Sequence, residues 1–286
     1  MTRTAHPMPI PAAALALAVG VVGLAIGSFL NVCIHRIPAG ESVVWPGSRC
    51  PACTAPIAWY DNVPLLSWVR LRGRCRACQA AIPLRYPVVE ALGGALALLS
   101  VARFGLTPWA AVAFAFSCAM LVVSLVDLDE GIIPDVISLP GILAGLAASA
   151  LVPGGAGLWN AFAGACLGGG LLWSVAAVYQ RAAGIEGLGL GDVKLLAMIG
   201  AFLGWQSIPA VLLIASFTGS VGGLAIVLGR RGRMRARRVL RSLGPAALFR
   251  HFRRTPLPFG PFLALAAVAA LYLPNLAVPW TWVSSS

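Results

Sequence analysis

Five long stretches of this 286-residue chain contain no Asp, Glu, Lys, Arg or His, and they restrict its fold more than any other feature. An α-helix needs roughly 20 apolar residues to cross a hydrocarbon core about 30 Å thick. Hydrophobic residues make up 59% of the chain and charged residues only 10%, which leaves too few polar groups for the surface of a water-soluble domain. The stretches therefore predict an all-α polytopic membrane protein. They cover residues 7–34, 104–126, 136–180, 195–229 and 255–286.

Two of these stretches are too long for one crossing and contain turn-forming residues. One breaks at Pro153 and the other between Gly204 and Pro209, because proline and glycine interrupt helices. A weaker apolar segment carries Glu90 and Arg103 near its ends. We therefore predict about eight transmembrane helices, at residues 9–34, 87–104, 108–127, 136–152, 157–179, 192–206, 208–229 and 258–280. No repeated unit with a period of 20–50 residues is expected.

The basic residues predict how the chain is oriented. The formal net charge is +12, and all of the 21 basic residues except Arg3 and Arg103 lie in or beside the odd-numbered connections. Because basic loops stay on the cytoplasmic side, both termini are expected outside. The predicted parts are a first transmembrane helix at 9–34, a cytoplasmic loop at 36–86 and a seven-helix core at 87–280. That core includes a basic cytoplasmic loop at 230–257, which would contact anionic lipid headgroups.

Four cysteines of the first cytoplasmic loop form two Cys-x-x-Cys pairs. They are Cys50, Cys53, Cys75 and Cys78, and 21 residues separate the pairs. Four thiolates at this type of spacing are typical of a structural zinc site, and a cytoplasmic loop is a reducing environment that disfavours disulfides. We predict a zinc-ribbon-like loop, with unligated thiols as the alternative. Nucleic acid is not expected as a partner, since the membrane topology itself accounts for the arginines.

Six of the nine acidic residues lie in two short connections that are predicted to face the cytoplasm. Carboxylates at a membrane boundary are costly to desolvate and often functional. Asp127 ends an apolar run and precedes Pro134 by seven residues, whereas Asp192 follows three alternating glycines and opens the next helix. The other four are Asp129, Glu130, Asp135 and Glu186.

Two aspartates at neighbouring helix ends can perform peptide hydrolysis, because one carboxylate activates water while one carboxylic acid protonates the carbonyl oxygen. We therefore predict that Asp127 and Asp192 are the catalytic pair. A helix N-terminus favours a carboxylate and a helix C-terminus favours the neutral acid. On placement alone, Asp127 is expected to hold the shared proton.

At these residues the sequence resembles the type IV prepilin leader peptidases, a family of bifunctional membrane aspartic proteases. The Asp127 segment and Gly189-Leu-Gly191-Asp192 match the two catalytic motifs of that family. The resemblance extends to the cysteine pairs and to further segments along the chain. These begin at Gly27, Asp61, Arg85 and Pro258, and the last reads Pro-Phe-Gly-Pro-Phe-Leu.

The resemblance implies a multi-pass protein of the bacterial inner membrane that cuts the basic leader from type IV prepilins, or from the pseudopilins of type II secretion, after a glycine on the cytoplasmic side. It also implies N-methylation of the new terminus with S-adenosylmethionine, for which Glu90 is a candidate contact. Asp129, Asp135 and Glu186 are candidate docking residues for the basic leader, with a purely structural role as the alternative, in which Asp135 would cap the helix expected at 136–152. A proton-coupled transporter and a non-catalytic scaffold for pilus or secretion assembly are the alternatives.

Overall fold

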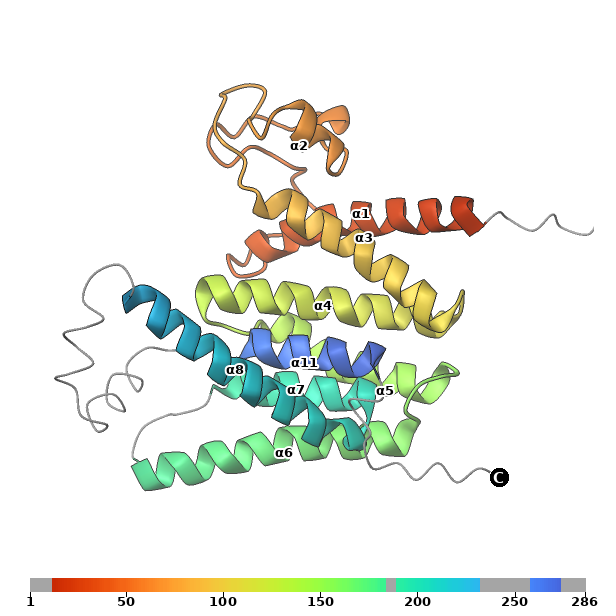
Figure 1. The fold of residues 1–286 in the computed structure, drawn as a ribbon, viewed down its shortest axis with the longest axis vertical. Helices are drawn as coiled ribbons and strands as arrows, with labels where there is room; N and C mark the ends of the chain where they lie inside the picture. The colour runs from red at the N-terminus through yellow and green to blue at the C-terminus, as the bar shows by residue number, and fades with distance from the viewer. Residues whose placement is uncertain (1–11, 184–188, 232–257, 274–286) are drawn as a thin grey trace, which may run out of the picture. The chain divides into compact units, whose positions relative to one another are not determined.

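The computed structural model describes residues 12–183, 189–231 and 258–273 of the chain (Figure 1). Long helices account for most of these residues. Within the described ranges the only extended pairing consists of two isolated backbone bridges in the cysteine loop. The all-α fold expected from the apolar stretches is therefore confirmed.

Five helical segments are long and apolar enough to cross a membrane. Three shorter helices, α5 (Asp135–Leu151), α7 (Leu190–Leu203) and α11 (Gly260–Tyr272), accompany them. Each of the eight segments expected from the sequence contains one helix, although eight crossings remain a prediction. The five long segments are α1 (Ala12–Arg36), α3 (Arg85–Phe104), α4 (Pro108–Glu130), most of α6 (Leu158–Ala183) and Trp205–Leu224, which joins the 3-10 turn η2 (Trp205–Ser207) to α8 (Ile208–Arg231).

Two helix ends differ from the expected ones for local reasons. α4 continues one turn beyond Asp127 to Glu130 and stops before Gly131, which has a left-handed φ of 69°. α7 stops at Leu203 because Gly204 has a φ of 80°, a conformation that ends helices. Glu186, most of the basic loop at 230–257 and the expected helical segment after residue 273 lie outside the described residues.

The chain divides into two compact units, Met1–Cys118 and Ala119–Ser286, with the division inside α4. In the first unit α1 packs against α3, and their backbones come close at glycines. A Cβ atom added to Gly27 would lie 2.8 Å from the Cα atom of Glu90, and one added to Gly23 would lie 2.7 Å from the carbonyl oxygen of Gly93. Small residues allow membrane helices to pack this closely. The cysteine loop between the two helices contains the turn η1 (Trp59–Asp61) and the short helix α2 (Leu66–Arg70).

In the second unit α7 is the central helix. Both α5 and α6 pack against it, and α11 packs against α7 and α8 (Figure 1). Leu195, Leu196 and Ile199 of α7 are completely buried. Gly164 of α6 and Gly200 of α7 face each other so closely that a side chain on either would overlap the other's backbone. This packing fixes α7, and with it the aspartate that its first turn carries.

Candidate active site and metal centre

Asp127 lies in the last turn of α4 and is almost completely buried, with 5% of its surface exposed. Its Oδ2 atom accepts a hydrogen bond of 3.0 Å from the backbone N–H of Gly260. Gly260 is the first residue of α11 and lies 133 positions further along the sequence. The carboxyl group of Asp127 is therefore held by the N-terminus of another helix.

Asp192 lies in the first turn of α7, as the sequence predicted. Gly189 precedes the helix as its N-cap, and its carbonyl oxygen accepts a hydrogen bond of 3.1 Å from the N–H of Asp192. The Asp192 side chain is half-buried, and it is close enough to Asp127 for the two carboxylate charges to repel each other. The structure thus brings the two predicted aspartates together within one unit.

Ile133, in the connection between α4 and α5, packs against the starts of both α7 and α11. A Cβ atom on Gly191 would lie 2.9 Å from the Cβ atom of Ile133, and a Cβ atom on Gly260 would lie 3.3 Å from its Cδ1 atom. The Gly260 position is further restricted, because the added atom would lie 2.6 Å from Oδ2 of Asp127. Glycine is required at both positions so that the three chain segments can meet beside the aspartates.

The arrangement has the chemistry of an aspartic hydrolase. Two carboxyl groups that repel each other retain one proton between them, which leaves one acid and one base. Burial of the Asp127 side chain opposes its ionisation, whereas the N–H of Gly260 favours the ionised form, because a hydrogen bond from a helix N-terminus stabilises a carboxylate. This contact opposes the effect of the α4 C-terminus, from which the sequence predicted that Asp127 holds the proton.

The other acidic residues near this pair have different surroundings. Asp129 and Glu130 are exposed at the end of α4. Asp135 is the first residue of α5, and its carboxylate binds the ammonium group of Lys194 from α7 at 2.7 and 2.8 Å. This ion pair between two helices gives Asp135 a basic partner, which the composition of the two acidic connections did not predict. Glu186 lies outside the described residues.

The four cysteines of the loop form one cluster. Their sulfur atoms all lie within 4.8 Å of one another, and the Cys50 and Cys78 sulfurs are 3.9 Å apart. A tetrahedral ion with metal–sulfur bonds of about 2.3 Å requires sulfurs about 3.8 Å apart. Backbone N–H groups of Cys53 and Ala52 point at the Cys50 sulfur and lower the pKa of that thiol to about 7, whereas, despite a hydrogen bond with the Ala80 backbone, the neighbouring thiols raise the pKa of Cys78 to about 11. The cluster therefore fits a tetrahedral metal ion that binds thiolates.

The two cysteine pairs are built in the same way, at positions 25 residues apart. In each pair the N–H four residues after the first cysteine donates to that cysteine's carbonyl oxygen, from a residue with positive φ. Each pair also closes with one isolated antiparallel bridge. The sequences share the pattern Arg-Cys-x-Ala-Cys-x-Ala-x-Ile, so the expectation of no repeat at this period was wrong for the cysteine loop. The positive-φ residues are Thr54 and Gln79, and the bridges join Arg49 to Pro56 and Arg74 to Ala81.

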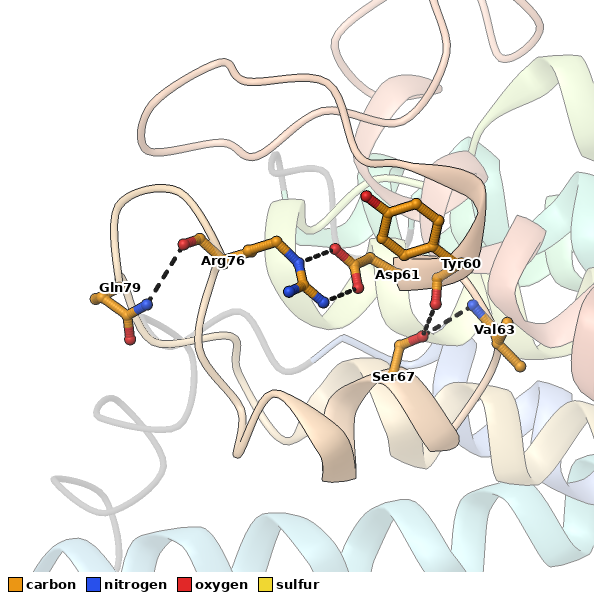
Figure 2. Close-up of polar contacts among 6 residues, drawn as sticks. All are labelled: Tyr60, Asp61, Val63, Ser67, Arg76 and Gln79. Carbon is orange, nitrogen blue, oxygen red and sulfur yellow. Dashed lines mark hydrogen bonds and ion pairs between the residues drawn. The ribbon is translucent and has the colours of Figure 1, made fainter.

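Polar contacts connect the second cysteine pair to the segment between the pairs (Figure 2). The Arg76 guanidinium donates two hydrogen bonds to Asp61, at 2.5 and 2.6 Å. These bonds hold the pKa of the Asp61 carboxyl below its usual range. Ser67 accepts a hydrogen bond from the N–H of Val63 and donates one to the carbonyl oxygen of Tyr60. The loop is therefore ordered by side-chain contacts as well as by its cysteines.

Glu90 anchors this loop to α3. Its Oε2 atom accepts a hydrogen bond of 2.8 Å from the N–H of Leu65, just before α2. At the other helix, Arg36 donates to the carbonyl oxygens of Ser42, Pro46 and Gly47. These contacts fix both ends of the loop. They also give Glu90 a structural role, whereas the sequence suggested either a contact for the methyl donor or a carboxylate at the membrane interface.

Two parts of the site were not identified as functional from the sequence. Gly260 was noted only within a sequence resemblance, and Lys194 was counted only as a basic residue. The sequence does mark Lys194 as unusual, because it is the only lysine in the chain. No pattern in the sequence places Gly260 beside Asp127.

Family models match two parts of the chain. Residues 21–104 match the bacterial peptidase A24 N-terminal domain, and residues 114–224 match the type IV leader peptidase family. The two matched ranges cover both aspartates and all four loop cysteines.

The chain is also similar over most of its length to proteins named prepilin leader peptidase/N-methyltransferase. One from Burkholderia pseudomallei is 38% identical, with 88% of this chain and 83% of the relative covered. One from Pseudomonas aeruginosa is 35% identical, with 93% and 91% covered. One from Myxococcus xanthus is 43% identical over 74% of this chain and 64% of the relative. No solved structure matches the chain.

Proposed function

The chain belongs to the type IV leader peptidase family, and from this premise we propose that it is a membrane aspartic endopeptidase with Asp127 and Asp192 as its catalytic residues. Its substrates would be prepilins or pseudopilins, from which it removes the basic leader after a glycine. The observation that supports this most directly is that Ile133 packs against both Gly191, next to Asp192, and Gly260, whose N–H binds Asp127, so that the end of α4 and the start of α7 lie side by side. The named relatives support the choice of substrate.

The hydrogen bond from Gly260 suggests which aspartate is the general base and which is the general acid. Asp127, as the carboxylate, takes a proton from water, and the water oxygen attacks the scissile carbonyl carbon. Asp192, as the acid, gives its proton to the carbonyl oxygen, which produces a tetrahedral diol. The proton on Asp127 then moves to the leaving nitrogen as the C–N bond breaks, and Asp192 recovers its proton from the diol.

A cleavage assay tests the assignment. The full chain in lipid nanodiscs is incubated with a purified prepilin, and Asp127→Asn and Asp192→Asn are compared with wild type. Both variants should lose detectable cleavage, since an amide can be neither the base nor the acid. Glu130→Gln is the matched control, because Glu130 is exposed one turn beyond Asp127, and it should cleave as wild type does. Activity in either aspartate variant would contradict the catalytic pair.

The alternatives from the sequence make different predictions in the same assay. A proton-coupled transporter or a non-catalytic assembly scaffold would cleave no prepilin even as wild type. Membership of a peptidase family favours the hydrolase over both of them. Wild-type cleavage that depends on both aspartates would exclude them.

For the leader, we propose electrostatic docking near the active site. Asp129 is exposed in the last turn of α4, and Glu186 is a second acidic candidate from the sequence. Asp135 is a weaker candidate, because Lys194 already binds its carboxylate. Asp129→Asn should raise the KM for a basic leader at low salt and change it little at high salt, because salt screens exposed charges. An unchanged KM at low salt would refute docking by Asp129.

For the cysteine loop, we propose a structural zinc ion bound by Cys50, Cys53, Cys75 and Cys78. The sulfur positions and the duplicated backbone turns support this choice. Elemental analysis of the purified chain should give one zinc per molecule. Cys53→Ser should lower this content and make the loop sensitive to protease. Full zinc content in that variant would refute the ligand set.

We also propose that the chain N-methylates the new terminus of the cleaved substrate, as the names of its relatives indicate. S-adenosylmethionine would supply the methyl group. The described residues contain no strand–glycine turn–helix unit of the kind that binds dinucleotides, so we assign no residue to the methyl donor. Transfer of label from S-adenosylmethionine to a cleaved prepilin tests the activity directly.

The basic residues support a topology with the catalytic aspartates at the cytoplasmic face of the bacterial inner membrane and both termini outside. The aspartates lie at helix ends, as this topology requires. Reporter fusions at the C-terminus and within the loop at 36–86 should report opposite sides of the membrane. The same side for both fusions would contradict the proposed orientation.

A further inference from the structure

Lys194 is unusual in this chain. It is the only lysine among the 21 basic residues, and it follows Asp192 by two positions on α7. The helix contains no other charged residues than these two. A lysine in this place needs an explanation, because an ammonium group is costly on a helix that is otherwise apolar.

The ammonium group binds the first residue of α5. Lys194 Nζ donates to both carboxylate oxygens of Asp135, at 2.7 and 2.8 Å. Asp135 follows Pro134, which is the N-cap of α5 and is buried. The ion pair therefore ties the beginning of α5 to the second turn of α7.

The connection that carries Asp135 begins at the other aspartate. The N–H of Gly131 donates to the carbonyl oxygen of Asp127 at 3.0 Å, and only residues 131–134 separate α4 from α5. Ile133 within this connection packs against Gly191, one residue before Asp192. The connection is thus held against the start of α7 at two points, by an apolar contact and by the ion pair.

From this geometry we propose that Asp135 and Lys194 form a positioning pair, which holds the segment after Asp127 against the helix that carries Asp192. The inference rests on the proposed function, because it assigns a role toward the two catalytic aspartates. Neither residue acts on the substrate. The pair sets the separation of the two carboxyl groups, and it neutralises a third carboxylate close to them.

An ordinary surface ion pair would have little effect, since exposed pairs in water contribute little. This pair differs in two ways. It joins residues 59 positions apart on two helices, and one ammonium group binds both oxygens of the carboxylate, with 32% of the lysine side chain and 56% of the aspartate side chain exposed. The two short bonds hold the lysine side chain of α7 toward the start of α5.

The test measures kcat and KM for prepilin cleavage by the full chain in nanodiscs. Asp135→Asn and Lys194→Gln should each lower kcat by about tenfold or more with KM nearly unchanged, because a displacement of about 1 Å can reduce a rate by about a hundredfold. Lys194→Arg should retain most of the rate. The exchange Asp135→Lys with Lys194→Asp should recover much of the loss, while Glu130→Gln serves as the unchanged control.

The single lysine provides a second readout that does not depend on activity. An amine-reactive reagent can label only Lys194 and the N-terminus, and peptide mass spectrometry separates the two. Labelling of Lys194 should be faster in Asp135→Asn than in wild type. Equal labelling rates would show that the ion pair does not form. This result can be obtained even from a preparation that cleaves no substrate.

Three results would overturn the proposal. Wild-type kcat in both single variants would show that the pair has no role in positioning. A higher KM that disappears at high salt would instead make Asp135 a docking residue for the leader. A charge exchange no better than the single variants would show that the two residues do not act together. Failure of wild-type cleavage would reject the proposed function, and the labelling experiment would still test the pair.

Discussion

The contact between Gly260 and Asp127 predicts a specific defect for Gly260→Ala. The added methyl group would begin 2.6 Å from Oδ2 of Asp127 and 3.3 Å from Cδ1 of Ile133. Carbon and oxygen atoms in contact are normally about 3.3–3.6 Å apart, so the carboxylate must move by roughly 0.7–1 Å. A movement of that size would break or distort the 3.0 Å hydrogen bond from the backbone N–H of Gly260.

The expected size of the defect follows from this lost bond. A hydrogen bond to a charged group contributes about 1.5–3 kcal/mol. If the transition state loses this amount, kcat falls by about 10- to 150-fold, since about 1.4 kcal/mol corresponds to a factor of ten. KM should change little, because the substrate does not need this bond in order to bind.

Prepilin cleavage by the purified chain in nanodiscs measures both constants, with Gly219→Ala as the matched control. An alanine at Gly219 of α8 would meet only aromatic carbons at 3.5 Å or more, so this variant should keep the wild-type rate. A normal kcat for Gly260→Ala, in a chain that still requires Asp127, would refute the view that the N-terminus of α11 holds the Asp127 carboxylate for the reaction.

Three further predictions concern the first unit. Cys53→Ser should remove the metal and open the loop to protease, because metal binding supplies about 10–16 kcal/mol of folding free energy in small zinc modules; an unchanged digestion pattern would contradict this. Gly27→Leu should lower the thermal stability of the chain, since its Cβ atom would lie 2.8 Å from the α3 backbone at Glu90. Gly20→Leu should be milder, because it meets only the Leu98 side chain, at 3.8 Å or more. Asp61→Asn should make the loop more sensitive to protease at pH 7, because only an ionised Asp61 forms the ion pair with the guanidinium. Below the lowered pKa of the wild-type carboxyl, wild type and variant should be equally sensitive. A difference that persists in acid would show that the ion pair is not what stabilises the loop.

The positions of the helices could be predicted because apolar length is a local property of the sequence. All eight expected segments contain helices, and errors occur mainly at their ends. Gly204 illustrates the limit, since its positive φ ends α7 three residues before the expected end at 206. A glycine is compatible with either a continuing or an ending helix, and only the tertiary packing selects between them.

The placement of the two aspartates at helix ends could be predicted because each lies at the boundary of an apolar run. Their surroundings could not. Gly260 reaches Asp127 across 133 residues of sequence, and nothing local indicates a contact over that distance. The effect of helix ends on Asp127 was therefore judged from α4 alone, without the opposing N-terminus of α11.

The ion pair of Asp135 was not predicted for a related reason. From the sequence, the connections around it had too few basic residues to balance their acidic ones, which suggested docking of a basic leader. The partner, Lys194, lies 59 positions further along the chain, at the start of the helix predicted at 192–206, and was counted with a different connection. Counting charges by connection therefore cannot find an ion pair between two helices.

The duplicated cysteine turns have a consequence for how the loop responds to metal. Each turn provides only two of the four sulfurs, so neither half can complete a tetrahedral site by itself. Capture of a single ion would organise both halves at the same moment, and its removal would release both together. The cysteine loop should thus behave as an all-or-none element, and its order should follow the concentration of metal in one steep transition.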